Sequence, residues 1–354
     1  ANFTQLLKNS GINIILYLGK FKALEKRHAL EKIKSGEAHI IIGTHSLIQE
    51  KVQYKKLGLA IIDEQHKFGV DQRIALTEKT KGAHCLVMTA TPIPRSLSLT
   101  QYGDLEISNI KTLPATRAGQ KTRIITPATY DKFLGFLKTR LSMQEQAYIV
   151  VPAIEENEDQ EFHALETIYK KFVNYYPEFV VGFLHGRLTS EEKNITMSEF
   201  KKGSIHILIA TTVIEVGIDV ANATVIAIIN PERFGLSSLH QLRGRVGRST
   251  KQGFCFLITD KKVYGTAMER LQVIEKNHDG FIIAEEDLKI RGEGDLFGTA
   301  QSGIANRKLA NIVEHENILI QVRNDVQALV LKNPKILESY THFFPQLRHV
   351  LSTI

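Results

Sequence analysis

The chain has 354 residues and a formal net charge of +7, with 43% hydrophobic and 23% charged residues. That balance is typical of a folded globular protein and excludes a disordered or collagen-like chain. No uncharged apolar stretch approaches the roughly 20 residues of a membrane helix, and the first residues lack the pattern of a secretion signal. We therefore expect a soluble, cytoplasmic protein, and the basic excess favours a polyanionic partner such as nucleic acid.

Apolar runs rich in isoleucine and valine alternate with stretches of helical periodicity. Such strands, separated by amphipathic helices, predict parallel sheets that helices cover on both faces. A stretch rich in proline, glycine and charge at 113–122 divides the runs into two series, which predicts two α/β lobes. The expected strands lie in 12–18, 39–44, 57–63 and 85–91 before that stretch, and in 122–126, 147–152, 179–186, 206–212, 224–230 and 254–259 after it.

The pattern changes after about residue 262. Residues 261–277 and 311–331 have helical periodicity, whereas 279–303 is rich in glycine and charge. We expect helices around a structured loop here, rather than a third sheet. The predicted domains are therefore 1–114, 115–262 and 263–354.

The two cysteines, Cys85 and Cys255, lie in apolar runs far apart in the chain. We expect both to be core thiols rather than parts of a disulfide or a metal cluster. A reducing compartment fits this pattern.

Two adjacent carboxylates, Asp63 and Glu64, end the apolar run that begins at Leu57. Side chains at the end of a parallel strand emerge into the crevice where ligands of open α/β sheets bind. In nucleotide hydrolysis, an aspartate there can hold magnesium while the neighbouring glutamate orients and deprotonates the attacking water. Two alternatives stay open: polar residues that only end a strand, and a zinc site, although the spacing matches no familiar zinc ligand set.

Small hydroxyl side chains end the next predicted strand, where Thr89 and Thr91 flank an alanine. They could hydrogen-bond to a neighbouring histidine or carboxylate and respond to the bound nucleotide. A simple turn before the prolines that follow is the alternative.

A similar pattern occurs in the second series, where Thr211 and Thr212 end a strand and precede Gly217 and Asp219. Hydroxyls and backbone amides at this place could bind a nucleic-acid phosphate, and Asp219 could bind a ribose hydroxyl. An ordinary strand, turn and strand would have the same pattern.

Residues 240–250 combine Gln241 with three arginines on a predicted helix that contains two glycines. Arg245 and Arg248 are three positions apart, so we expect both guanidinium groups on one helical face. Their planar donor forks suit phosphate oxygens and the charge that develops in phosphoryl transfer. We therefore predict a phosphate-binding segment rather than a merely basic surface.

Four segments resemble, in this order, the later motifs of superfamily 2 helicases and translocases: DEQH at 63–66, TAT at 89–91, ATTVIEVGIDV at 210–220 and QLRGRVGR at 241–248. The longer segment DEQHKFGVDQR and the tail at 279–303 resemble the RecG family of bacterial ATP-dependent helicases. That tail is similar to the translocation motif of the RecG and Mfd families. The resemblance covers nearly the whole chain and implies an α/β fold: two RecA-like lobes with parallel sheets, the first incomplete, and a C-terminal helical and loop translocation region.

The resemblance also implies ATP and Mg²⁺ as cofactors and a role for each matching residue. Asp63 and Glu64 would bind magnesium and activate water, and the γ-phosphate would be approached by Gln241, Arg245 and Arg248. Gly217 and Asp219 would contact the nucleotide. Coupling of the nucleotide to lobe movement would involve Gln65, His66, Thr89 and Thr91. The DNA-binding and translocation residues would be Thr44, His45, Thr211, Thr212, Arg291 and Gln301.

These roles imply an ATP-dependent DNA helicase that remodels replication forks and Holliday junctions in recombination and repair. We expect it to act as a monomer on branched double-stranded DNA, without a membrane partner. An Mfd-like transcription-repair coupling translocase is the alternative within the same superfamily. A non-catalytic DNA-binding fragment is the alternative from a different class.

The sequence departs from the family in three places. No G-x-x-x-x-G-K-[ST] segment is present, so we expect the chain to begin within the first lobe and to hydrolyse ATP poorly by itself. We also expect the amino-terminal wedge domain of the family to be missing. Ala300 stands where RecG members often have arginine, and Glu293 stands where proline is common.

Overall fold

The computed structural model describes residues 2–49, 51–64, 82–90, 108–110, 112, 118–152, 158–211, 220–259, 263–291 and 315–333. The chain forms two compact units, Ala1–Ala90 and Thr91–Ile354. The domain boundaries expected near 114 and 262 stay a prediction. Among the described residues, no helix has the length and apolar character that a membrane crossing requires.

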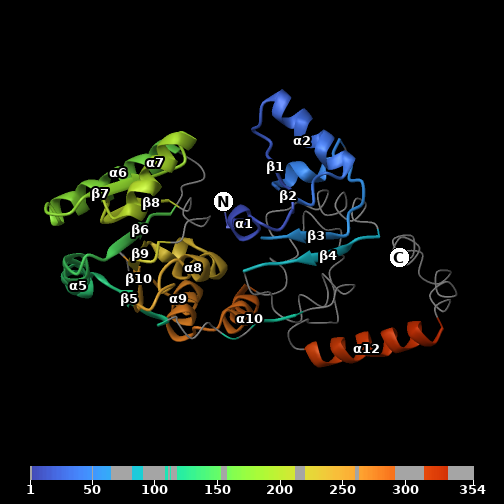
Figure 1. The fold of residues 1–354 in the computed structure, drawn as a ribbon. Helices are drawn as coiled ribbons and strands as arrows, with labels where there is room; N and C mark the ends of the chain where they lie inside the picture. Colours follow the sequence, from blue (N-terminus) through green and yellow to red (C-terminus); the bar gives the residue numbers. More distant parts are fainter. Residues whose placement is uncertain are drawn as a thin grey trace. The chain divides into compact units, whose positions relative to one another are not determined.

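The second unit is built on a six-stranded parallel sheet in the order β5–β10–β9–β6–β8–β7 (Figure 1). Each strand lies in a run that the sequence predicted as a strand. The three central strands β6, β8 and β9 are almost completely buried, which explains their near-continuous apolar sequence. The bounds are Gln120–Ile125 (β5), Gln146–Val150 (β6), Val181–Leu184 (β7), Ile207–Ala210 (β8), Ala223–Ile229 (β9) and Gly253–Ile258 (β10).

Helices cover both faces of this sheet. Because side chains alternate along a strand, Ile149 points into one core and Tyr148 into the other. The core around Ile149 includes Phe133 of α5 and residues of α6. The opposite core includes residues of α7, α8, α9 and α10. The bounds are Tyr130–Ser142 (α5), Glu158–Tyr175 (α6), Ser190–Lys202 (α7), Leu236–Arg243 (α8), Thr266–Lys276 (α9) and Gly280–Arg291 (α10).

The first unit contains two pairs of parallel strands, β1 with β2 and β3 with β4. These four strands also match predicted runs. A small core forms where Tyr17 of β1, Ile33 of α2 and Val52 meet. The bounds are Asn2–Leu6 (α1), Ile14–Tyr17 (β1), Ala23–Ser35 (α2), Ile40–Gly43 (β2), His45–Ile48 (η1), Leu59–Ile62 (β3) and His84–Val87 (β4).

Cys255 is buried, as expected, but the expectation of a core thiol is wrong for Cys85, which is exposed. Cys85 lies on β4, which pairs only with β3 in the described part of the chain. Apolar neighbours such as Ile61 and Leu86 are exposed as well. The apolar run at 85–91 therefore predicted strand β4 correctly. The burial expected for its side chains was wrong.

The tail contains the helices α9 and α12 (Glu316–Lys332), both within stretches of predicted helical periodicity. The segment at 279–303 differs from the expected loop, because its first part forms helix α10. Ile283 and Leu288 of α10 are buried, so packing against the neighbouring helices stabilises a segment whose glycine and charge content had suggested a loop.

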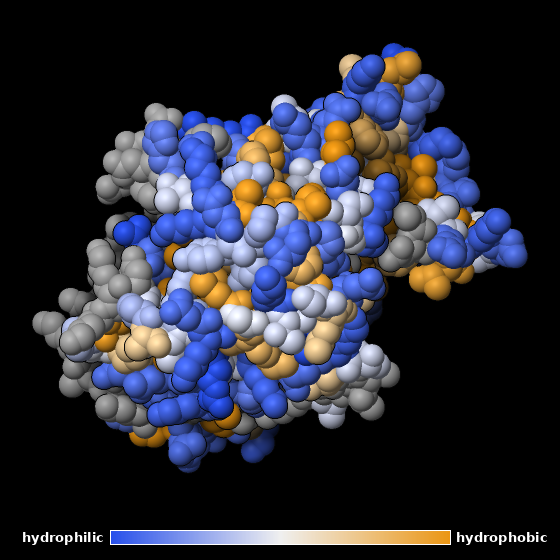
Figure 2. Space-filling view, turned by 90° about the vertical axis from the view of Figure 1, so that its left-hand side faces the viewer, coloured by the Kyte–Doolittle hydropathy of each residue, from blue (hydrophilic) through white to orange (hydrophobic). Residues whose placement is uncertain are grey.

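Most described residues on the face in Figure 2 are hydrophilic, and apolar residues lie between them in small groups. Scattered apolar side chains are usual on the surface of a soluble domain.

A largely buried ion pair, Arg140–Glu145, connects the last turn of α5 with the sheet of the second unit. Arg140 donates from Nε and Nη2 to the two carboxylate oxygens of Glu145, at 2.7 and 2.9 Å. The Thr224 hydroxyl of β9 also donates to this carboxylate. The guanidinium carbon of Arg140 lies 4.9 Å from the centre of the Phe254 ring on β10. The pair therefore connects α5 with β9, with β10 and with Glu145, the residue directly before β6.

Replacing Arg140 with methionine should lower the free energy of unfolding by about 3–5 kcal/mol, because the Glu145 carboxylate would stay buried without its cation. Urea denaturation measures this change. Lys138→Met is a matched control on the same helix, since the Lys138–Glu178 pair is 57% and 42% exposed and should contribute less than about 1 kcal/mol. Equal losses in the two variants would contradict the assigned role of burial.

Candidate functional site

Asp63 and Glu64, which the sequence predicted to bind magnesium and to activate water, lie at the carboxyl-terminal edge of the β3–β4 sheet. Ile62, the last residue of β3, pairs with Val87, the last residue of β4. The parallel register therefore brings Asp63 and Glu64 to the same edge as Thr89. Sequence reasoning had placed these residues at strand ends, and the register brings the two ends together.

The backbone at Glu64 has a positive φ of 54°, in the left-handed region that non-glycine residues rarely adopt. Asp63 supports this turn, because its Oδ1 accepts the backbone N–H of Glu64 at 3.0 Å. Strained backbone of this kind often occurs at functional sites, where the surrounding structure holds it in place. Asp63 is exposed and Glu64 is half-buried. The predicted partners Gln65, His66 and Thr91 lie outside the described residues.

The donor groups at this edge are oxygens. The described residues contain no group of three or more histidine, cysteine, aspartate or glutamate side chains that could hold a metal ion. Mg²⁺ fits such a sparse site, because proteins usually hold it with one or two carboxylates and let substrate phosphates and water complete the octahedron.

Thr44 and His45 follow β2 in the first unit, and both side chains are exposed. Thr44 precedes η1, and its hydroxyl lies 3.1 Å from the Ser46 hydroxyl. A Cβ at Gly43 would collide with the Tyr17 carbonyl oxygen of β1, so glycine permits the close strand pairing that ends at Gly43, directly before Thr44. The turn presents polar groups that a nucleic-acid phosphate could contact.

In the second unit, Thr211 follows β8, and its N–H donates to the Leu184 carbonyl of β7 at 3.3 Å. Its side chain is only 1% exposed. The predicted site residues that follow it, Thr212, Gly217 and Asp219, lie outside the described residues.

The arginine segment differs from its prediction in one respect. Helix α8 ends at Arg243, so Arg245 and Arg248 lie in the turn that follows and not on a helical face. Gly247 shapes the turn that follows the helix, because its φ is +71° and a Cβ at this position would collide with the Gly119 carbonyl oxygen. Gln241 lies on the helix as expected and is half-buried.

The turn is held in place on both sides of Val246, which is completely buried. The Gln120 side chain donates to the Val246 carbonyl at 2.7 Å. Arg248 donates from Nε to the Gly244 carbonyl at 2.8 Å, and the Arg245 N–H bonds to the carbonyl of Leu242. Both arginines are half-buried. The turn therefore holds two guanidinium groups on a fixed backbone, as a phosphate site requires.

Sequence reasoning gave no separate role to Arg243, which is 1% exposed and donates hydrogen bonds to carbonyls at the end of α9. A signal was present in the periodicity of α8. Arg243 stands four positions after Leu239 and seven after Leu236, on the face that packs into the core.

The predicted translocation residues lie near the limit of the described chain. Arg291 is the last residue of α10, and its side chain lies outside the described part. Gln301 lies outside it as well.

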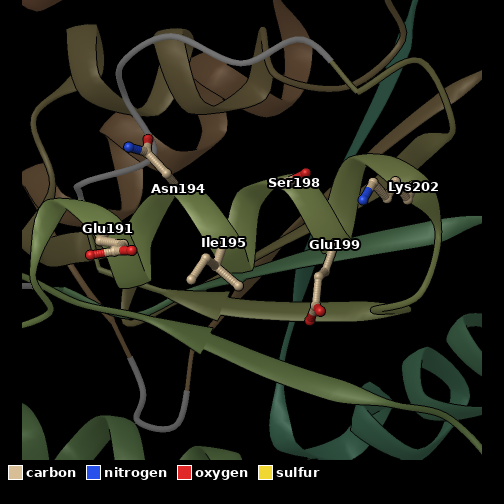
Figure 3. A pocket seen from close by; sticks show the side chains of 6 residues that line it. All are labelled: Glu191, Asn194, Ile195, Ser198, Glu199 and Lys202. Atoms are coloured by element: carbon tan, nitrogen blue, oxygen red, sulfur yellow. The ribbon is translucent and has the colours of Figure 1, made fainter.

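A shallow hollow follows one face of α7 (Figure 3). None of the predicted site residues lines it. Two carboxylates and one lysine lie along it, so it offers little to a phosphate. The lining residues are Glu191, Asn194, Ile195, Ser198, Glu199 and Lys202.

Three family models match the chain. Residues 1–100 match the DEAD/DEAH box helicase model, and 129–250 match the helicase conserved C-terminal domain. Residues 277–351 match the model of ATP-dependent DNA helicase RecG, domain 3, C-terminal. The matches follow the order of the motifs along the chain.

Relatives named ATP-dependent DNA helicase RecG are similar over most of the chain. The relative from Synechocystis sp. is 44% identical over 91% of this chain and 39% of its own length. The relative from Haemophilus influenzae is 42% identical over 96% and 50%, and one from Staphylococcus epidermidis is 41% identical over 98% and 51%. The chain thus spans about half the length, or less, of these relatives.

Solved structures agree with this likeness. The structure of RecG bound to a three-way DNA junction matches with a TM-score of 0.67 and 39% identity, over 89% of this chain and 41% of that chain. Saccharomyces cerevisiae Dbp5 bound to RNA and ADP BeF3 matches with a TM-score of 0.55 at 17% identity, over 81% of this chain and 75% of that chain, which supports the fold alone.

The RecG-specific model, the relatives at 41–44% identity and the structural match all point to the same family. The expected α/β class and parallel sheets are confirmed as well. The chain belongs to the RecG family of helicases.

Proposed function

We propose that this chain forms part of an ATP-dependent motor that remodels branched double-stranded DNA, including replication forks and Holliday junctions, in recombination and repair. The observation that carries the proposal is the edge of the β3–β4 sheet, where parallel register brings Asp63, Glu64 and Thr89 together. The names of the relatives, and the junction bound by one of them, support ATP and branched DNA as ligands.

In this proposal the first unit supplies the acidic half of the site. The Asp63 carboxylate binds magnesium, directly or through water, and Glu64 orients the attacking water and accepts its proton. Magnesium, when bound with ATP, neutralises charge on the phosphates. Water oxygen then bonds to the γ-phosphorus as the bond to the β–γ bridging oxygen breaks, and ADP carries the electron pair away. Gln65, His66, Thr89 and Thr91 respond to the change at the γ-phosphate.

The second unit supplies the basic half. Arg245 and Arg248 stabilise the negative charge that develops on the γ-phosphate, and Gln241 helps to place it. Gly217 and Asp219 contact the nucleotide on the same side.

DNA contacts complete the motor. Thr44 and His45 of the first unit bind the DNA backbone, and so does Thr212 of the second unit. The Thr211 side chain is only 1% exposed and is therefore not available to DNA, contrary to its predicted role. Arg291 and Gln301 act in the translocation loop that follows α10. We further propose that the protein acts as a monomer in the cytoplasm.

Two alternatives are less well supported. An Mfd-like transcription-repair coupling translocase would share the motor residues, but the match at 277–351 is to a RecG-specific model. A non-catalytic DNA-binding fragment would not require the arginine turn. An Mfd-like translocase would displace RNA polymerase from DNA, whereas a RecG-like motor would regress a model fork. A non-catalytic fragment would show no DNA-stimulated ATP hydrolysis.

Replacing Arg245 or Arg248 with alanine should slow DNA-stimulated ATP turnover by about 10³-fold, if either residue serves as an arginine finger, and leave DNA affinity essentially unchanged. The test uses the longest protein that the gene encodes and measures phosphate release and DNA binding. Arg233→Ala is the matched control, since Arg233 is an exposed arginine of η5 (Pro231–Arg233) in the same unit. Normal turnover in both site variants would contradict the assignment.

Replacing Arg291 with alanine should uncouple the two activities. ATP would still be hydrolysed in the presence of DNA, whereas unwinding of a model fork would fall, because Arg291 is proposed to act on DNA and not on the phosphates. The control is Lys289→Ala, which removes an exposed cation of the same helix that pairs with Glu286. Equal loss of both activities in the Arg291 variant would argue against a translocation role.

DNA affinity should depend on salt if backbone phosphates supply the binding energy. The logarithm of the affinity should fall linearly with the logarithm of the salt concentration, by about 0.9 for each phosphate contact on duplex DNA. Fluorescence anisotropy with a labelled fork at several salt concentrations measures the slope. A slope of zero would count against every DNA-binding interpretation.

A further inference from the structure

Gln120, the first residue of β5, holds the backbone of the turn at 244–249, which carries Arg245 and Arg248. Its Nε2 donates to the Val246 carbonyl at 2.7 Å, although the two residues lie 126 positions apart in the chain. Val246 directly follows Arg245 and lies two residues before Arg248. One side-chain amide is therefore bonded to the backbone between the two guanidinium groups.

The two residues before Gln120 contact the same turn. The Ala118 N–H donates to the Ser249 carbonyl at 3.3 Å. A Cβ at Gly247 would lie 2.6 Å from the Gly119 carbonyl oxygen, so the backbone of the turn lies directly against this segment. The segment that enters β5 therefore contacts the turn in its middle and at its end.

The turn also lies against the start of β10. A Cβ at Gly253, the first residue of β10, would lie 2.8 Å from the α-carbon of Gly247. Gly253 pairs with Gln120 in the parallel register, and its N–H donates to the Gly119 carbonyl at 3.0 Å. The turn is thus seated on the first residues of two neighbouring strands, and the Gln120 amide adds a bond from a side chain.

This bond fixes a part of the turn that the core alone leaves free. The Val246 side chain is completely buried, but a buried side chain does not set the direction of its own carbonyl. The Gln120 amide sets that direction, and Arg248 donates from Nε to the Gly244 carbonyl of the same turn at 2.8 Å. A group that acts on a transition state must be held within about 0.5 Å of its productive position, and supporting hydrogen bonds do this. Gln120 therefore supports the backbone from which both guanidinium groups extend.

We propose that Gln120 is a positioning residue for ATP hydrolysis, which directs Arg245 and Arg248 by fixing the Val246 carbonyl. The inference rests on the proposed function and adds to it a residue to which the sequence gave no role. Gln120 contacts neither nucleotide nor DNA in this account. Its loss should therefore slow the chemical step and leave the binding of ATP and DNA unchanged.

The test compares Gln120→Met with wild type in the longest protein that the gene encodes, by DNA-stimulated ATP hydrolysis well below the melting temperature of each variant. Methionine is similar in length to glutamine but has no N–H donor. The kcat should fall by roughly 10- to 100-fold, because a displacement of about 1 Å in a positioned group can cost about 10²-fold. The KM for ATP and the affinity for a model fork should stay within about twofold of wild type, because the arginines act on charge that develops in the transition state.

Two further variants separate positioning from a general loss of stability. Gln120→Lys restores an N–H donor of similar reach and should restore most of the kcat. Gln252→Met is the matched control, because Gln252 is also half-buried and its amide donates to the Gly253 carbonyl at 3.3 Å rather than to the turn. The kcat of this control should equal that of wild type.

A double variant tests whether Gln120 acts through the arginines. Gln120→Met is combined with whichever arginine variant has lost turnover, Arg245→Ala or Arg248→Ala. The combination should cause little further loss of kcat, because residues that act as one hydrogen-bonded unit have non-additive effects.

Three results would overturn the inference and leave the proposed function in place. They are a wild-type kcat in the folded Gln120→Met protein, a Gln120→Lys protein no more active than Gln120→Met, and an additive loss in the double variant. Normal turnover in both single arginine variants would instead remove the proposed role of the turn, and the inference with it.

Discussion

Parallel strand pairing is the interaction on which the candidate site depends. Hydrogen bonding in register makes neighbouring strands end at the same edge, so residues distant in sequence meet there. Ile62 and Val87 pair at the end of β3 and β4, and the polar residues after them become neighbours. In the second unit, Leu184 and Ala210 pair in the same way, and Thr211 continues from that edge. A shift of register would separate these residues without changing any of them.

The second unit adds a constraint of close packing. The turn with Arg245 and Arg248 follows α8 and is fixed by the buried Val246, by the left-handed Gly247 and by a hydrogen bond from Gln120. Arg243 fixes the end of α8 itself to the end of α9. Two guanidinium groups are thus held by a backbone with little freedom, which reduces the reorganisation needed when a phosphate binds.

Sequence patterns predicted all ten strands of the described residues, because apolar runs of this length are typical of the strands of parallel sheets. They also placed Asp63, Glu64 and Thr89 at strand ends. Features that depend on distant contacts were not predictable. The turn at Gly247 depends on its close approach to Gly119, and the partners of Arg243 lie at the end of another helix.

Burial was harder to predict than secondary structure. Cys85 lies in an apolar strand and is nevertheless exposed, because burial depends on which elements cover a strand and not on the strand alone. Helix α10 illustrates the reverse case, in which tertiary packing stabilises a segment with weak local signals.

The central proposal is that the turn with Arg245 and Arg248 acts on the γ-phosphate of ATP. A crystal structure of the full-length protein with forked DNA and a transition-state analogue of ATP tests it most directly, through the distances from the Arg245 and Arg248 guanidinium nitrogens to the oxygens of the γ-phosphate mimic. The proposal predicts at least one contact at about 2.7–2.9 Å, the length of a charge-assisted hydrogen bond. Guanidinium groups that point away from the nucleotide in that complex would contradict it.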